Sequence, residues 1–252
     1  MAARDELISF LDELLDAGSF EDYGPNGLQV PGSDEVSRVA TGVSAHRELF
    51  ERAAAEGAQL VLCHHGIFWG PGFGPLTARM KARLKVLFDA DMSLAAYHLP
   101  LDAHAEVGNN ALICAGLGLE RGDAFGESKG RPVGWVGNAA EPLSVGTLVE
   151  RCTQLFGSPP LVFDSGPAEI RRVGIVSGGA ASMIDAALQL GLDAFITGEP
   201  TEPVMADARE GGIHFIAAGH YATETLGIRR LGELLAERFG VEHRFIDVPN
   251  PV

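Results

Sequence analysis

Apolar residues in this chain gather in short runs, which alternate with longer stretches where they recur every three or four positions. Short runs bounded by turn residues predict buried strands, and the recurring pattern predicts amphipathic helices. In the first half the predicted strands are 38–43, 60–65 and 93–97, and the predicted helices are 45–56 and 77–90. Gly57 follows the first of these helices, where it predicts a C-cap. Strands that alternate with helices predict parallel α/β layers.

The second half repeats part of this pattern. It begins with a predicted turn and strand at 126–137, a helix at 144–156 and a short strand at 161–164. Residues 172–199 then align with 38–65 without a gap. This match favours duplication of a βαβαβ unit, although any two such units share a similar hydrophobic pattern. We expect an α/β fold with mainly parallel sheets, in halves 1–125 and 126–252, with the C-terminal segment packing back on the first half.

Composition and charge narrow the classes of partner. The 252 residues include 19 Lys and Arg against 34 Asp and Glu, which gives a formal net charge of −15. This balance disfavours a nucleic-acid backbone, because binding to phosphates depends on Lys and Arg. The sequence has no apolar run of the ~18 residues that a membrane span needs, and its first residues predict an amphipathic helix rather than a signal peptide. Three widely spaced cysteines fit a reducing cytoplasm. We expect a cytoplasmic protein that binds a small molecule.

Polar side chains follow three of the predicted strands where each strand ends. His64 and His65 close one strand, His98 leads to Asp102 after the next, and His220 leads to Glu224 in the second half. Ligands of open α/β sheets bind at the carboxyl ends of the strands. His220 and Glu224 are four positions apart, so a helix that begins there would place both on one face.

These imidazoles and carboxylates form a mixed nitrogen and oxygen donor set. Such a set suits Zn, Fe, Mn or Co and is poor for Ca. Adjacent strand residues point to opposite faces, so His64 and His65 would have to splay at the strand end, each serving a different ion. Two ions a few Å apart lower the pKa of a water and polarise the bond that it attacks. The pattern therefore predicts a dinuclear site for hydrolysis.

Each of these residues also has a structural alternative. A single histidine at a strand end is often only a hydrogen-bonded structural residue. Asp102 follows Pro100 and could cap a turn, and Glu224 could cap a helix start. Phe68 and Trp69 are expected to be wall or packing residues. Ser-Gly-Gly-Ala at 177–180 lies between a strand and a helix and could hold phosphate as an accessory anion site, although it matches no dinucleotide or P-loop motif.

Seven motifs in order resemble one known family over nearly the whole chain. They are Asn-Gly-Leu-Gln-Val at 26–30, His-His-Gly-Ile-Phe-Trp at 64–69, His-Leu-Pro-Leu-Asp-Ala-His at 98–104, Gly-Asn-Asn at 108–110, Asp-Ala-Phe-Ile-Thr-Gly-Glu at 193–199, Gly-His-Tyr-Ala-Thr-Glu at 219–224 and Phe-Ile-Asp-Val-Pro-Asn-Pro at 245–251. The chain resembles the Nif-three-like family of dinuclear-metal hexameric proteins, especially its YbgI-type bacterial members. Some members carry the name GTP cyclohydrolase I type 2 or its homologue.

The resemblance implies a ligand set and an assembly. The ligands of two divalent transition metal ions per chain (Zn, Fe or Mn) would be His64, His65, Asp102, His220 and Glu224, with Glu224 as the bridge. The resemblance also implies two interlinked α/β domains and a toroidal homo-hexamer. His98, His104 and Glu199 would face the substrate or support the ligands. Many relatives carry a second histidine where this chain has Tyr221, which puts a proton-transfer role at that position in doubt.

Two functional hypotheses follow. The first is a metal-dependent hydrolase that acts on a small nucleotide-like molecule, with GTP as a candidate and with His98 or Glu199 moving protons. The second is a non-catalytic, metal-binding hexameric scaffold or interaction protein. Metal positions saturated by protein ligands would favour the scaffold, whereas open positions would favour catalysis.

Overall fold

The computed structural model describes residues 1–70, 72 and 74–252, and these form two compact units. Unit 1 consists of Met1–Leu101 and Gly227–Pro249, and unit 2 of Asp102–Leu226 and Asn250–Val252. This division differs from the expected halves, because the chain leaves unit 1 after residue 101 rather than near 125 and returns to it at 227. The returning segment gives unit 1 its last helix and an edge strand.

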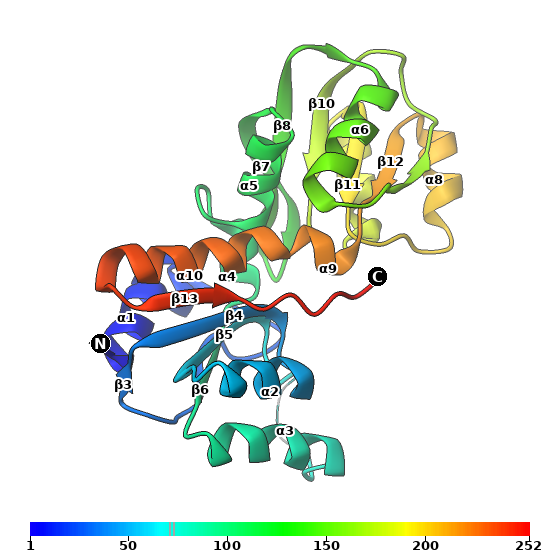
Figure 1. The fold of residues 1–252 in the computed structure, drawn as a ribbon. Helices are drawn as coiled ribbons and strands as arrows, with labels where there is room; N and C mark the ends of the chain where they lie inside the picture. Colours follow the sequence, from blue (N-terminus) through cyan, green and yellow to red (C-terminus); the bar gives the residue numbers. More distant parts are fainter. Residues whose placement is uncertain (71, 73) are drawn as a thin grey trace. The chain divides into compact units, whose positions relative to one another are not determined.

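Unit 1 is built on a five-stranded sheet with the order β13-β4-β5-β6-β2 (Figure 1). Its strands are β2 (Gly27–Val30), β4 (Arg38–Ser44), β5 (Leu60–His65), β6 (Ser93–Ala96) and β13 (Glu242–Phe245). Four of them run parallel, and only β2 is antiparallel to its neighbour β6. A further pair, β1 (Ala2–Ala3) with β3 (Glu35–Val36), lies outside this sheet. This sheet is therefore mixed, and the expectation of mainly parallel sheets stays a prediction.

Helices cover both faces of the unit 1 sheet. The helices are α1 (Arg4–Leu14) and α10 (Thr225–Phe239) on one face, and α2 (Arg47–Ala55) and α3 (Ala78–Asp89) on the other (Figure 1). The Thr77 hydroxyl caps α3 by accepting the backbone N–H of Met80. Gly57, which follows α2, has a φ of +71°, the left-handed conformation that the C-cap prediction required. Leu49 and Phe50 of α2 are buried against β4 and β5. The chain continues from β6 into the short helix α4 (Leu99–Ala103), which crosses into unit 2.

Unit 2 is built on a six-stranded mixed sheet with the order β7-β8-β10-β11-β12-β9. Its strands are β7 (Glu120–Ser128), β8 (Arg131–Leu143), β9 (Leu161–Phe163), β10 (Ile170–Ile175), β11 (Ala194–Thr197) and β12 (His214–Ala217). Only β10, β11 and β12 are parallel to one another, whereas β7, β8 and β9 pair in the antiparallel sense. Both sheets are therefore mixed. Each unit contains one βαβαβ series, and its origin by duplication stays a prediction.

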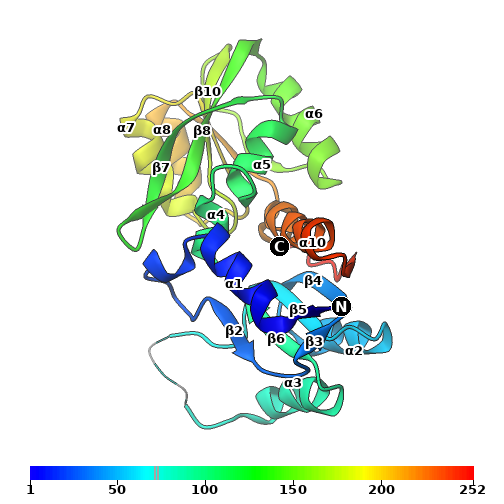
Figure 2. The same cartoon turned by 90° about the vertical axis from the view of Figure 1, so that its left-hand side faces the viewer.

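The helices of unit 2 also cover both faces of their sheet (Figure 2). They are α5 (Asn109–Gly116) and α6 (Val145–Phe156) on one face, and α7 (Ile184–Gln189) and α8 (Val204–Gly211) on the other. Two short 3-10 helices are also present, Ala17–Ser19 in unit 1 and Ala181–Met183 in unit 2. Ile113 and Leu148 are fully buried in the core between α5, α6 and the sheet. The short helix α9 (His220–Thr223) follows β12. Among the described residues, none of the helices combines the length and the apolar character needed to cross a membrane.

Candidate metal centre

Two histidines stand at the carboxyl end of β5 with their imidazoles side by side. The rings of His64 and His65 have centroids 4.8 Å apart and are tilted by 44°. Strand alternation alone would send them to opposite faces. The end of the strand brings them together instead, and His65 there pairs with Ser44 of β4.

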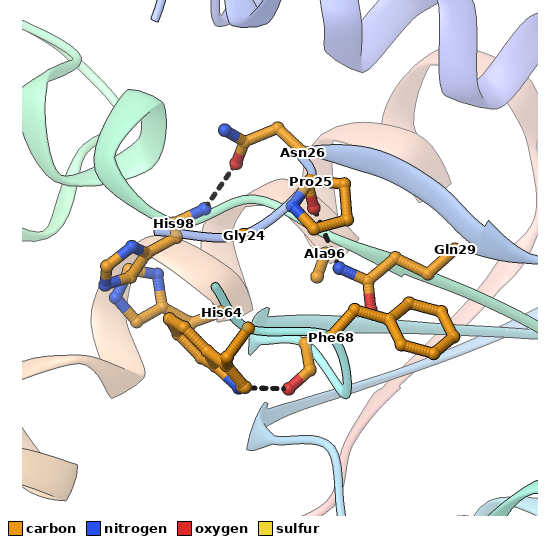
Figure 3. A pocket seen from close by; sticks show the side chains of 10 residues that line it. Gly24, Pro25, Asn26, Gln29, His64, Phe68, Ala96 and His98 are labelled. Carbon is orange, nitrogen blue, oxygen red and sulfur yellow. Dashed lines mark hydrogen bonds between the residues drawn. The ribbon is translucent and has the colours of Figure 1, made fainter. Parts of the chain in front are cut away.

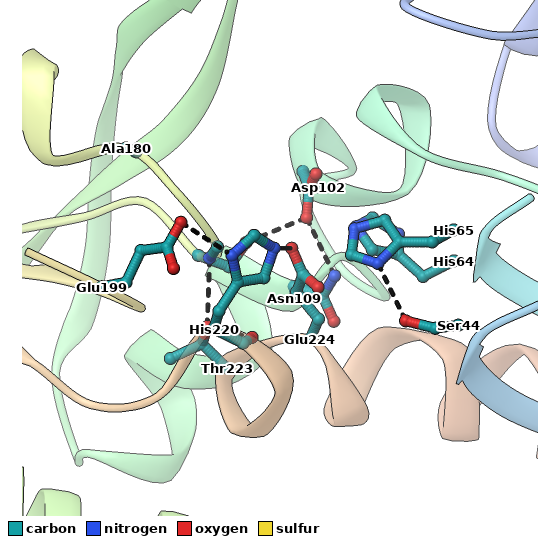
Figure 4. A network of polar contacts seen from close by, with 12 residues as sticks. Ser44, His64, His65, Asp102, Asn109, Ala180, Glu199, His220, Thr223 and Glu224 are labelled. Carbon is teal, nitrogen blue, oxygen red and sulfur yellow. Dashed lines mark hydrogen bonds and ion pairs between the residues drawn. The ribbon is translucent and has the colours of Figure 1, made fainter. Parts of the chain in front are cut away.

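The Nδ1 atoms of both imidazoles are held by oxygen atoms of unit 1. The Nδ1 atom of His64 lies 3.0 Å from the carbonyl oxygen of Tyr97, and that of His65 lies 3.2 Å from the Ser44 hydroxyl oxygen (Figure 4). A carbonyl only accepts, so Nδ1 of His64 carries the proton and Nε2 presents the lone pair. Orientation of this kind, through the second ring nitrogen, is the usual support of a metal-binding histidine.

His98 joins this pair and is oriented by a carboxylate. Its Nδ1 atom lies 2.7 Å from Oδ1 of Asp22, and its backbone N–H donates to Oδ1 of Asn26 at 2.8 Å. Asp22 also accepts the backbone N–H groups of Tyr23 and Leu99. Burial would raise the pKa of Asp22, but the hydrogen bonds that it accepts from His98, the Asn26 amide and the backbone N–H of Tyr23 outweigh burial, so the pKa is lowered. Asp22 is therefore a carboxylate that fixes Nε2 of His98 as its lone-pair atom.

The three imidazoles can share one ion. One ring nitrogen from each of His64, His65 and His98 lies within 4.8 Å of the others. A small pocket of about 10 Å³, room for about one water, opens beside them and is lined also by Asn26 and Phe68 (Figure 3). Three neutral imidazole donors fit a divalent transition ion such as Zn or Fe and fit Ca poorly. Unit 1 thus carries three imidazoles that could hold one metal ion, with His98 beside the two expected ligands.

Unit 2 holds a buried carboxylate, Asp102, oriented by two donors. Asp102 lies on α4 and is 6% exposed. Its Oδ1 atom accepts the Asn109 amide at 2.8 Å and the Ser177 hydroxyl at 2.9 Å. Two neutral donors at one oxygen fix the direction of the carboxylate without neutralising its charge, as in the outer shell of a metal ligand. A turn-capping role does not account for this network, because both donors are side chains.

His220 lies between two carboxylates of unit 2 (Figure 4). Its Nε2 atom is 3.1 Å from Oε1 of Glu224, and its Nδ1 atom is 3.2 Å from Oε1 of Glu199. The hydrogen bond to Glu224, against the effect of burial, raises the pKa of His220 to about 9, and Glu199 adds to the rise. His220 and Glu224 therefore lie close together, as their spacing predicts. The helix that brings them together, α9, is a single turn that ends just before Glu224.

Backbone amides of the loop at 177–180, the suggested accessory anion site, donate to side chains of unit 2. The backbone N–H of Gly178 donates to the Thr223 hydroxyl at 3.1 Å, and that of Ala180 donates to the Thr197 hydroxyl at 3.2 Å. A Cβ atom at Gly178, which has a φ of +67°, would overlap Oε1 of Glu224. These two loop amides thus have partners within unit 2, and the two glycines admit carboxylates at close range.

Sequence reasoning missed the residues that orient the candidate ligands. Asp22, Ser44 and Ser177 lie far along the chain from the groups that they contact, and only the folded backbone brings them near. His104, expected as a supporting residue, accepts the backbone N–H groups of Glu106 and Val107, both at 3.1 Å. These contacts place His104 in a turn of unit 2.

Comparisons with known proteins agree with the motifs. The model of the family described as Duf34/NIF3 (NGG1p interacting factor 3) matches residues 2–251. A protein of Pseudomonas aeruginosa named GTP cyclohydrolase 1 type 2 homolog is 44% identical over 250 residues, which cover 99% of this chain and 98% of the relative. A protein of Escherichia coli K12 with the same name is 44% identical over 248 residues, with 98% of each chain covered.

Solved structures of similar chains carry the same fold. The protein ybgI, described as of unknown function, superposes with a TM-score of 0.94 at 40% identity over 100% of both chains. TTHA1606 from Thermus thermophilus superposes with a TM-score of 0.89 at 36% identity, again over 100% of both chains. Reduced HcgD from Methanocaldococcus jannaschii has a TM-score of 0.85 at 22% identity, a likeness of fold alone.

Proposed function

We propose that this chain, which belongs to the Duf34/NIF3 family, is a dinuclear metal-dependent hydrolase that acts on a small nucleotide-like substrate, with GTP as the first candidate. The observation that carries the proposal is the cluster of His64, His65 and His98, whose Nδ1 atoms all face oxygen partners. Such an arrangement prepares three Nε2 lone pairs for an ion. The names of the Pseudomonas and Escherichia relatives suggest the substrate class.

The proposed ligands of the two ions are His64, His65, Asp102, His220 and Glu224. This set of ligands is the one that the family resemblance implies. Bound Zn, Fe or Mn would supply a Lewis acid and lower the pKa of a nearby water. Glu224, with two carboxylate oxygens, is the proposed bridge.

Two residues of the chain are proposed to move protons. His98 holds one proton on Nδ1 against Asp22, which leaves Nε2 able to accept another. Glu199 is 37% exposed and hydrogen-bonds to His220, so it can exchange protons with both solvent and the imidazole. His98 could instead be a third nitrogen ligand of unit 1. A His98→Ala variant that keeps its metal and loses turnover supports proton transfer, whereas loss of metal assigns His98 to the ligand set.

The decisive test of the hydrolase is turnover of nucleotides by the metal-loaded protein. Glu224→Gln keeps the shape of the side chain and removes the charge that a bridging ligand needs. We expect this variant to lose turnover by about three orders of magnitude, a loss typical of removing essential catalytic groups. Glu237→Gln is the matched control, because Glu237 is exposed and pairs only with Arg230 among the contacts of its side chain. Unchanged turnover in Glu224→Gln would refute the bridging role.

The second candidate is a non-catalytic metal-binding scaffold. The family description itself names an interaction with another protein, NGG1p. A homo-hexamer is proposed for either function on the family resemblance, and native mass spectrometry measures it directly. If the metal-loaded protein turns over no nucleotide and its metal positions are saturated by protein ligands, the scaffold is favoured.

A further inference from the structure

We propose that a groove between α3 and residues 67–69 binds the phosphate groups of the substrate through Arg79 and Arg83. This inference rests on the proposed function, whose substrate is nucleotide-like, and assigns the part of unit 1 that recognises its anionic end. The groove has a volume of about 270 Å³ and is lined by Phe68, Trp69 and Met80 beside the two arginines. That volume is slightly below the ~300 Å³ of the smallest drug-sized sites, so it suits the phosphate end of a nucleotide rather than the whole molecule.

Arg79 and Arg83 are two like charges without a carboxylate partner. They are four residues apart on α3, so their side chains lie on the same face of the helix. Neither guanidinium forms an ion pair with a carboxylate among residues 1–70, 72 and 74–252. Burial and the charge of Arg79 lower the pKa of Arg83. The charge of Arg83 in turn adds to burial in lowering the pKa of His46.

This pair differs from four other basic side chains on the helices of unit 1. Each of those four has an acidic partner one turn away. The pairs are Arg47 with Glu51, Arg52 with Glu48, Lys85 with Asp89, and Arg230 with Glu233. Like charges one turn apart destabilise a helix slightly. An anion between Arg79 and Arg83 would remove that repulsion, and the planar, fork-like guanidinium matches phosphate oxygens.

Trp69 connects the groove to the imidazole cluster. Its ring centroid is 5.3 Å from that of His98 and 5.7 Å from that of His65. Its indole N–H donates to the carbonyl of Gly66 at 2.9 Å, which fixes the ring, and 47% of the residue is exposed. Trp69 lines both the pocket beside His64 and the groove. A planar ring stacked on Trp69 would therefore have the imidazoles at one end and the arginines at the other.

The test is a binding titration followed by tryptophan fluorescence on the metal-loaded protein. The chain has two tryptophans, Trp69 and Trp135, so the variant Trp69→Phe shows which of them responds. We expect GTP to quench Trp69 and inorganic triphosphate to compete with it, whereas guanosine binds far more weakly. The double variant R79Q/R83Q should raise the Kd for GTP about 100-fold, because each charge-assisted contact contributes about tenfold.

The matched control is K81Q/K85Q, which removes the same charge from the same helix. Lys81 and Lys85 are exposed and do not line the groove. We expect the Kd for GTP of this control to change by less than about threefold, because salt screens the attraction between GTP and charges that do not contact it. Equal weakening in both double variants would overturn the proposal, and so would wild-type protein that binds guanosine as well as GTP.

Turnover separates this inference from the proposed function. If GTP binding is lost in R79Q/R83Q while no nucleotide is turned over by the wild type, the groove is an anion site and the hydrolase proposal fails. If R79Q/R83Q turns over GTP with an unchanged KM, the hydrolase stands and the groove is not its phosphate site. The proposed site and activity together predict a raised KM with kcat less affected.

Discussion

Replacing Asp22 by asparagine should destabilise unit 1 and disorder the orientation of His98. Asp22 is 2% exposed at its side chain and accepts four hydrogen bonds. Oδ1 takes the Tyr23 N–H at 2.6 Å and the His98 Nδ1 at 2.7 Å, while Oδ2 takes the Asn26 amide and the Leu99 N–H, both at 2.9 Å. An amide nitrogen at either position would face two donors.

The expected cost follows from those contacts. Asp22→Asn loses two hydrogen bonds to an ionised acceptor, each worth about 1.5–3 kcal/mol. Partial relaxation of the loop reduces the sum, so we expect the free energy of unfolding to fall by about 2–4 kcal/mol. Equilibrium urea denaturation measures it. Asp89→Asn is the control, because Asp89 is an exposed partner of Lys85 and such pairs contribute less than about 1 kcal/mol.

The pH dependence gives this prediction a sign. The pKa of Asp22 is lowered in the folded protein, so its stabilisation is present above the unfolded pKa of about 4 and is lost as pH falls through the folded pKa. The stability difference between wild type and Asp22→Asn should therefore shrink below about pH 4. A difference under about 0.5 kcal/mol at neutral pH, equal to that of the control, would refute the reasoning.

Three further predictions follow. Ser177→Ala removes one of two donors to Asp102 and should weaken metal binding about tenfold in a competitive chelator titration; an unchanged affinity would mean that the Ser177 hydroxyl does not orient a metal ligand. The pKa of His220 is raised to about 9, so the imidazole is protonated at pH 7 in the absence of metal. Metal binding should therefore release one proton from His220 at pH 7 and none above about pH 10, and calorimetry in buffers of different ionisation enthalpy measures the number of protons released. Gly232→Ala should cost about 1–3 kcal/mol in urea denaturation, because its Cβ would overlap the His243 imidazole; a neutral effect would mean that the imidazole moves away freely.

The local pattern was enough to predict the strand that carries the histidines. The apolar run that ends at His64 and His65 is β5, and the helix before it, α2, ends at Ala55, two residues before Gly57. These features depend on burial of one face and on a glycine with positive φ, both of which are encoded within a few residues.

Features that depend on distant partners could not be predicted in this way. The strand β7 (Glu120–Ser128) was missed because most of its first residues are exposed and polar, without a clear alternation. β7 pairs with β8, and β9 with β12, in the antiparallel sense. The sequence of one strand alone does not indicate which strand it pairs with or in which direction. The same holds for Asp22, whose contact with His98 spans 76 positions of the sequence.

The most direct test of the central claim is the metal content of freshly purified protein, measured by elemental analysis per chain. The account predicts about two transition ions per chain, Zn, Fe or Mn. The Asp102→Ala variant should lose both ions together, because they would share one dinuclear centre. Asp89→Asn should retain both. Protein that holds no transition metal, even after reconstitution, would contradict the account and leave the histidines of β5 with a structural role only.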